Sequence, residues 1–145
     1  MWFSAGVTLL FLVDRLTKWL AIHSLPREGL FLVPRLTGVI LERNQGIAYS
    51  IPLPKLPLIF TVFVIMVILV ALLIRTYRRG ELAAAAAFGL IIVGAFSNLL
   101  DRLRYDYVID MIVLTGWPVF NLADVMIMAG ALWLVMRIFK KKKAA

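Results

Sequence analysis

The sequence predicts an all-α membrane protein with four transmembrane helices and a small extracytoplasmic β-cradle. Apolar residues make up 63% of the 145-residue chain, and the mean hydropathy is +0.95. Soluble domains contain roughly 45–50% apolar residues, and a chain this short has too little interior to bury the excess. Two charge-free runs, 56–74 and 82–100, are also long enough to cross a bilayer. We therefore expect a single integral-membrane domain over residues 1–145.

Two further apolar runs, 2–22 and 118–139, are interrupted by charged residues. The interrupting residues are Asp14, Arg15, Lys18, Asp124 and Arg137. We still interpret both runs as spans, because charges inside a membrane helix are costly and usually mark a functional site. The first run does not fit a cleaved signal peptide, since its start has no positive residue and its middle is charged.

The basic residues predict the orientation. Eight Lys and Arg residues lie in the link after the second span and in the C-terminal tail, whereas the loops 23–56 and 101–117 hold six in all. Basic residues favour the cytoplasmic side, so we expect both termini in the cytoplasm and both loops outside. Within the first loop, 30–33 and 36–41 are rich in β-branched and apolar residues, which predicts short strands on the membrane surface.

The composition also excludes several kinds of chemistry. The chain has no cysteine, which excludes a thiol nucleophile, a disulfide and a thiolate metal site. Its single histidine, His23, gives little support to a histidine triad or a multi-histidine metal site. The net charge of +8 is concentrated at span ends, which indicates topology signals and lipid anchors rather than nucleic-acid binding. We expect no metal and no cofactor.

Polar residues gather at the predicted outer face. They are Asp14, Lys18, Asn44, Asn98, Asp101, Asp110, Asn121 and Asp124. Spacings of three and four residues put Asn121 with Asp124 on one helix face, and Asn98 with Asp101 and Arg102 on another. Counting from Pro118, Asp124 should sit about 9 Å down the fourth helix.

Paired carboxylates suit peptide hydrolysis. Two close carboxylates cannot both ionise, so they share a proton; one then activates water while the other polarises a carbonyl. Spacing alone does not decide which two aspartates form the pair. The candidates are Asp14, Asp101, Asp110 and Asp124. Asp101 beside Arg102 could be a helix-end ion pair, and Asp14 with Lys18 an intrahelical salt bridge. We expect Arg15 to face a different side or to snorkel toward the interface.

Five blocks carry a family resemblance. They are DRLTK at 14–18, NQGIAYS at 44–50, GAFSNLLDR at 94–102, VID at 108–110 and FNLAD at 120–124. In this order, and with this four-span layout, the chain resembles lipoprotein signal peptidase, also called signal peptidase II. The resemblance implies an aspartic endopeptidase that removes the signal peptide of diacylglyceryl-modified prolipoproteins, cutting before the lipidated cysteine.

The resemblance also assigns residues. It implies that Asp110 and Asp124 are the catalytic pair. The residues that it implies for substrate contact or support of the pair are Asp14, Lys18, Asn44, Gly46, Asn98, Asp101, Arg102, Asn121 and Ala123. The chain departs from the family pattern at Arg15, Tyr49, Met111 and Asp106. Asp106 stands where glycine is typical, and its carboxylate could add negative charge near Asp110 or distort the loop.

Other functions remain open. Embedded carboxylates also build proton- or ion-coupled transporters, and polar residues can serve only to join the helices of a non-catalytic scaffold. Oxygen ligands could hold a metal in a hydrolase, whereas no serine has an evident lysine partner. Besides a diacylated prolipoprotein and membrane lipid we expect no partner: the chain should be a monomer in a bacterial inner membrane, with its site near the outer leaflet.

Overall fold

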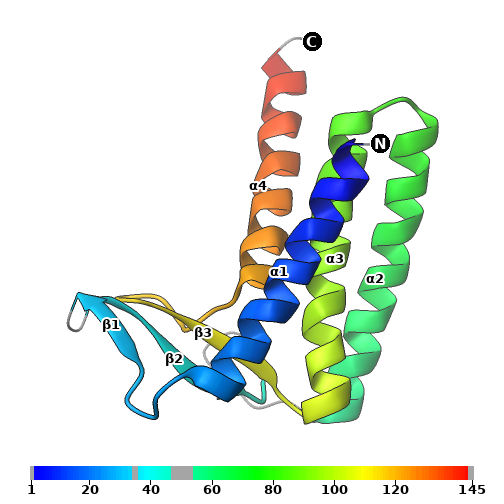
Figure 1. Cartoon of the computed structure of the whole chain (residues 1–145). Coiled ribbons are helices and arrows are strands. Elements are labelled where there is room, and N and C mark those ends of the chain that lie inside the picture. The colour runs from blue at the N-terminus through cyan, green and yellow to red at the C-terminus, as the bar shows by residue number, and fades with distance from the viewer. Residues whose placement is uncertain (1, 34–35, 47–53, 144–145) are drawn as a thin grey trace.

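The computed structural model describes residues 2–33, 36–46 and 54–143. These residues form helices and one small sheet (Figure 1). In chain order the elements are α1 (Trp2–Ser24), β1 (Leu30–Val33), β2 (Thr37–Asn44), α2 (Lys55–Arg78), α3 (Leu82–Tyr105), β3 (Val108–Leu114) and α4 (Leu122–Lys143). The sheet lies at one end of the helices, and both termini and the turn between α2 and α3 lie at the other (Figure 1).

Helix α3 is the centre of the bundle, because it packs against α1, α2 and α4. Small residues allow the close approach to α4. A Cβ atom on Gly94 would lie 2.5 Å from the carbonyl oxygen of Ala123, and one on Gly130 would lie 2.6 Å from that of Ala87. The two backbones are therefore nearly in contact, which fixes the start of α4 against the middle of α3.

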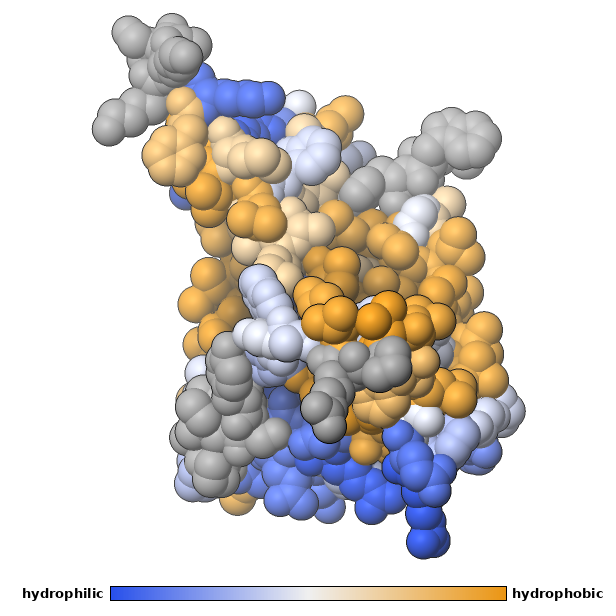
Figure 2. Space-filling view, turned by 90° about the vertical axis from the view of Figure 1, so that its left-hand side faces the viewer, coloured by the Kyte–Doolittle hydropathy of each residue, from blue (hydrophilic) through white to orange (hydrophobic). Residues whose placement is uncertain are grey.

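Three of the helices are long and apolar enough to cross a membrane: Lys55–Arg78, Leu82–Tyr105 and Leu122–Lys140. Helix α1 has a similar length of 23 residues but carries three charged residues near its middle. Side chains along the helices form a broad apolar surface, and hydrophilic side chains gather at the lower edge of the molecule (Figure 2). Strand β1 is itself apolar, and all four of its residues are exposed. The protein is thus mostly helical, with the apolar surface that lipid requires.

The sheet has the order β1-β2-β3, with antiparallel pairing throughout. The predicted strands in the first loop are confirmed as β1 and β2. Strand β3 was not predicted, although its sequence VIDMIVL is apolar and β-branched. Its Ile109 and Met111 pack with Ala21 of α1 in a buried cluster that joins the sheet to the bundle.

Two expected boundaries were wrong. The fourth helix begins at Leu122 rather than 118, because Phe120 pairs with Ile112 of β3 and holds this segment extended. Asp124 therefore lies in the first turn of α4 and not 9 Å down the helix. Helix α3 continues to Tyr105, so Asp101 and Arg102 lie within it rather than in a loop.

The residues that depart from the family pattern lie in different surroundings. Met111 is buried in the sheet. Asp106 is the residue that ends α3 with a left-handed backbone (φ 70°), and its exposed carboxylate pairs with Lys55. The positive φ explains why glycine suits this position. Tyr49 lies outside the described residues.

Candidate active site

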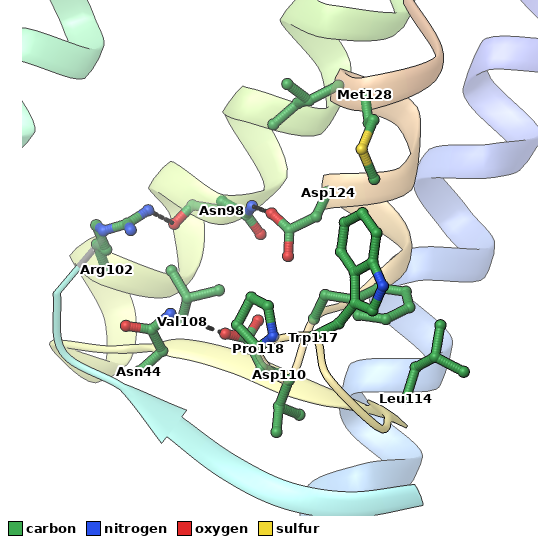
Figure 3. Close-up of a pocket in the computed structure, with 13 residues that line it drawn as sticks. Asn44, Asn98, Arg102, Val108, Asp110, Leu114, Trp117, Pro118, Asp124 and Met128 are labelled. Atoms are coloured by element: carbon green, nitrogen blue, oxygen red, sulfur yellow. Dashed lines mark hydrogen bonds between the residues drawn. The ribbon is translucent and has the colours of Figure 1, made fainter. Parts of the chain in front are cut away.

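Asp110 and Asp124 line the same cavity, which has a volume of about 450 Å³ (Figure 3). Asp110 comes from β3 and Asp124 from the first turn of α4, and both carboxylates face the cavity from different sides (Figure 3). Most of the remaining wall is apolar. It includes Val108, Leu114, Trp117, Phe120, Ile127 and Met128. The two acids therefore line one largely apolar cavity at the sheet end of the bundle.

Asp110 is almost fully buried, with 2% of its surface exposed. Its Oδ2 accepts a hydrogen bond from Asn44 Nδ2 at 2.9 Å, and its Oδ1 accepts one from Asn121 Nδ2 at 2.6 Å. Burial, together with the nearby charge of Asp124, raises the pKa of Asp110 to about 6, although the hydrogen bonds from both asparagines and the charge of Lys18 oppose the change. Asp110 can thus change its protonation state close to neutral pH.

Asp124 owes its position to the way α4 begins. Asn121 Oδ1 accepts a hydrogen bond from the backbone N–H of Asp124 at 3.0 Å, and Asp124 Oδ2 accepts one from the backbone N–H of Asn121 at 3.1 Å. This reciprocal pattern resembles a capping box, which satisfies helix N–H groups that otherwise lack partners. The sequence Asn-Leu-Ala-Asp therefore starts the helix and places a carboxylate at its first turn.

Asn98 connects Asp124 to the interior of the bundle. Its Oδ1 accepts hydrogen bonds from Lys18 Nζ at 2.8 Å and from Asn121 Nδ2 at 3.1 Å, and its Nδ2 donates to Asp124 Oδ1 at 2.8 Å. An ammonium group can only donate. Lys18 thus requires the oxygen of the Asn98 amide on its own side, which leaves the NH2 group facing Asp124.

A buried ion cluster supports this arrangement. Lys18 Nζ lies 2.8 Å from Asp101 Oδ2 and 3.2 Å from Asp14 Oδ2, and all three side chains are fully buried. Asp14 also accepts from Ser97 Oγ at 2.5 Å and from the backbone N–H of Ala123 at 2.8 Å. The expected pair of Asp14 and Lys18 is therefore present, within a larger cluster that ties α1 to α3 and α4.

Arg15 does not lie where we expected it. Rather than facing a different side, it lies against α3, where its Nη1 is 2.6 Å from Asp101 Oδ1 and 3.2 Å from Ser97 Oγ. Asp101 thus pairs with Arg15 and Lys18 rather than with its neighbour Arg102. Spacing along one helix could not reveal this pairing, because it depends on how α1 and α3 pack together.

Arg102 connects α3 to the segment after β2. Its Nη2 donates to the carbonyl oxygen of Gly46 at 2.9 Å, while the N–H of Gly46 donates to Asn44 Oδ1 at 3.0 Å. Arg102 lines the cavity, and its buried Nε–H has no hydrogen-bond partner among the described residues.

All eleven site residues expected from the sequence belong to this one connected arrangement, through the hydrogen bonds and ion pairs given above. Sequence reasoning missed Ser97 and the apolar wall formed by Trp117 and Met128. The surroundings of Ser97 and the apolar wall form only when separate helices and strands pack together, so a pattern within one segment does not predict them. Across the described ranges, no three histidine, aspartate or glutamate residues are grouped so that they could hold a metal ion.

Comparisons with known proteins identify the relatives of the chain. The family model described as signal peptidase (SPase) II matches residues 7–140. A lipoprotein signal peptidase of Halothermothrix orenii is 33% identical over 138 residues, covering 94% of each chain. One of Chlorobaculum tepidum is 36% identical, covering 92% of this chain and 93% of the relative.

Solved structures show the same fold. One bacterial membrane enzyme, determined by the in meso method, superposes with a TM-score of 0.80 at 22% identity, covering 94% of this chain and 86% of the other. A second gives a TM-score of 0.75, also at 22% identity, covering 92% of this chain and 90% of the other. Fold and family together define a bacterial membrane peptidase of the aspartic class. The chain belongs to the signal peptidase II family, which confirms the resemblance found in the sequence.

Proposed function

We propose that Asp110 and Asp124 are the catalytic pair of this peptidase, and that its substrate is a prolipoprotein carrying a diacylglyceryl-modified cysteine. The observation that carries the proposal is the shared cavity, in which both carboxylates are fixed by the same asparagine. The relatives named above are lipoprotein signal peptidases, and the substrate follows from that likeness.

The two acids divide the chemistry between them. With one proton on the pair, the ionised carboxylate removes a proton from a water molecule, whose oxygen attacks the scissile carbonyl carbon. The protonated carboxyl group donates a hydrogen bond to the carbonyl oxygen, where negative charge develops. When the tetrahedral intermediate collapses, the C–N bond breaks and the leaving nitrogen takes a proton from the pair.

The polar neighbours would act as positioning residues. Asn44, Asn98 and Asn121 donate hydrogen bonds to the carboxylates and fix their orientation. In our proposal the guanidinium group of Arg102, which lines the cavity, donates a hydrogen bond to a carbonyl oxygen of the substrate backbone. Asp14, Lys18, Asp101 and Ala123 hold the helices that carry these groups, and Gly46 keeps Asn44 in place.

The cavity wall suits a lipidated substrate. Leu114, Trp117 and Met128 border the carboxylates with apolar surface (Figure 3), which favours acyl chains over a polar peptide. Excluding water in this way also strengthens electrostatic interactions between the acids and the carbonyl group. We therefore assign the acyl chains to this wall and the scissile peptide bond to the polar side.

For the topology we propose that α1 is the fourth span and that both termini are cytoplasmic. The cost of the charges in α1 is reduced because Asp14 and Lys18 are buried against α3 rather than exposed to lipid. The basic residues of the α2–α3 turn lie at the same end as the termini (Figure 1), as the positive-inside rule requires. The sheet and the acids would then lie at the outer leaflet, in a monomeric protein.

A cleavage assay tests the proposal. Purified protein in micelles should cut a diacylated lipobox peptide and leave the same peptide without acyl chains intact. Asp110→Asn and Asp124→Asn should each abolish turnover while circular dichroism shows an unchanged helical content. Turnover should persist with a chelator present. Full activity in both variants would exclude the pair and favour a scaffold role for the acids, and loss of activity with chelator would indicate a metal-dependent hydrolase.

A further inference from the structure

A second cavity of about 330 Å³ lies between α1 and the end of α3. Its lining consists of Arg15, Trp19, Ile22, His23, Arg104, Tyr105 and Ile109. It shares no lining residue with the cavity that holds the two acids. Ile109 borders this second cavity, whereas its neighbours Val108 and Asp110 border the first. Because successive residues of a strand point to opposite faces, the two cavities lie on opposite faces of β3.

The lining of the second cavity is positively charged. Arg15 and Arg104 bring two guanidinium groups, His23 adds an imidazole ring, and none of the seven lining residues is acidic. Arg15 already pairs with Asp101. Arg104 has no carboxylate partner in the part of the chain that the structure describes, and its guanidinium group lies 5.1 Å from the ring centre of Tyr105. Two guanidinium groups that line one cavity favour a phosphate, because a guanidinium group can bind a phosphate through two parallel hydrogen bonds.

The surroundings favour a lipid phosphate. The cavity lies at the ends of two membrane helices, where Trp19 stacks on His23 with 4.7 Å between ring centres. Tryptophan and tyrosine are typical of the headgroup level of a bilayer. An apolar face of α1 runs from the cavity toward the start of the helix. It consists of Trp19, Leu16 and Leu12, at spacings of three and four, and all three side chains are exposed. An acyl chain could extend along this apolar face while its phosphate remains at the arginines.

We propose that this second cavity binds the phosphate of an anionic membrane phospholipid, with the acyl chains lying along α1. The site is separate from the peptidase cavity, and its test needs no cleavage. A zwitterionic headgroup carries its own ammonium close to the phosphate and so competes with the arginines. An anionic headgroup such as phosphatidylglycerol has no such group, and the site should therefore prefer it over phosphatidylcholine.

Native mass spectrometry of the full chain tests the proposal. Protein extracted from nanodiscs that contain equal amounts of phosphatidylglycerol and phosphatidylcholine should retain phosphatidylglycerol preferentially. Arg104→Gln and His23→Gln should each weaken this retention, by about fivefold for the arginine. Arg78→Gln is the matched control, because Arg78 is an exposed arginine in the last turn of α2, at the opposite end of the bundle. Because Arg78 belongs to the separate basic cluster at the end of α2, Arg78→Gln should weaken only the retention of loosely held lipid and should leave the most tightly retained phosphatidylglycerol in place.

A second measurement distinguishes a lipid from a soluble anion. The thermal unfolding midpoint in neutral micelles should rise when phosphatidylglycerol is added, and much less when inorganic phosphate or glycerol phosphate is added at the same concentration. The rise should be smaller in Arg104→Gln. Equal retention by Arg104→Gln and Arg78→Gln, equal retention of the two lipids, or equal protection by soluble phosphate would each overturn the proposal.

Discussion

Asp110 and Asp124 lie on different elements, yet both accept a hydrogen bond from Asn121, which donates its side-chain Nδ2 to one and its backbone N–H to the other. The same residue begins α4 and accepts from the backbone of Asp124. The separation of the two acids therefore depends on a helix cap as well as on the bundle. This relationship makes the polar neighbours of the acids as testable as the acids themselves.

Removing Asn44 should change the pH dependence of the peptidase. The hydrogen bond from Asn44 lowers the pKa of Asp110, so in Asn44→Ala this pKa should rise above its value of about 6. The acidic limb of the kcat/KM profile should then move to higher pH, because ionisation of the pair needs a higher pH. The apparent pKa that this limb reports is a property of the two coupled acids rather than of either one alone. An acidic limb at the wild-type position would show that Asn44 does not act on Asp110.

Asn121→Ala should have a larger effect than Asn44→Ala. It removes the side-chain donor to Asp110 and also the acceptor of the Asp124 backbone N–H. Loss of one positioned donor lowers kcat by about 10²–10³ in other enzymes, and loss of a helix cap costs about 1 kcal/mol. We expect both effects, measured by single-turnover cleavage and by thermal unfolding. Loss of stability without loss of kcat would limit Asn121 to the cap.

Lys18 and Arg15 form a matched pair, because both bind Asp101 but only Lys18 also binds Asn98. Lys18→Met leaves the buried carboxylate of Asp14 without its cation and should cost about 3–5 kcal/mol. Arg15→Met, from a partly exposed position, should cost less, about 1.5–3 kcal/mol. Only Lys18→Met frees the amide of Asn98 to rotate, so kcat per folded molecule should fall much further in that variant. Equal values of kcat per folded molecule would remove this role of Lys18.

Gly94 should tolerate no side chain. A Cβ atom there would lie 2.5 Å from the carbonyl oxygen of Ala123, so Gly94→Ala must push the start of α4 away from α3. Overpacking of this kind costs about 1–3 kcal/mol, and the shift should also lower turnover, because Asp124 follows Ala123. Gly6→Ala is the control, since a Cβ on Gly6 would meet nothing within 4 Å. Equal unfolding midpoints for the two variants would contradict the close approach of α3 and α4.

The sequence allowed prediction of three apolar spans, the first two strands and the composition of the site. The spans follow from long apolar runs, and the site residues follow from five short motifs in order. The start of α4 was misplaced because the apolar run began at Pro118, whereas Asn121 caps the helix and Phe120 pairs with β3. The partner of Arg15 and the second cavity arise from the packing of α1 on α3, which no local pattern encodes.

A double-mutant cycle of the two acids tests the central claim most directly. Single-turnover cleavage of the diacylated peptide would be measured for the wild type, Asp110→Asn, Asp124→Asn and the double variant, with helical content checked for each. Residues that act as one unit are strongly non-additive. We therefore expect each single variant to lose as much rate as the double variant. Rate losses that multiply in the double variant, or substantial turnover in either single variant, would contradict a shared catalytic pair.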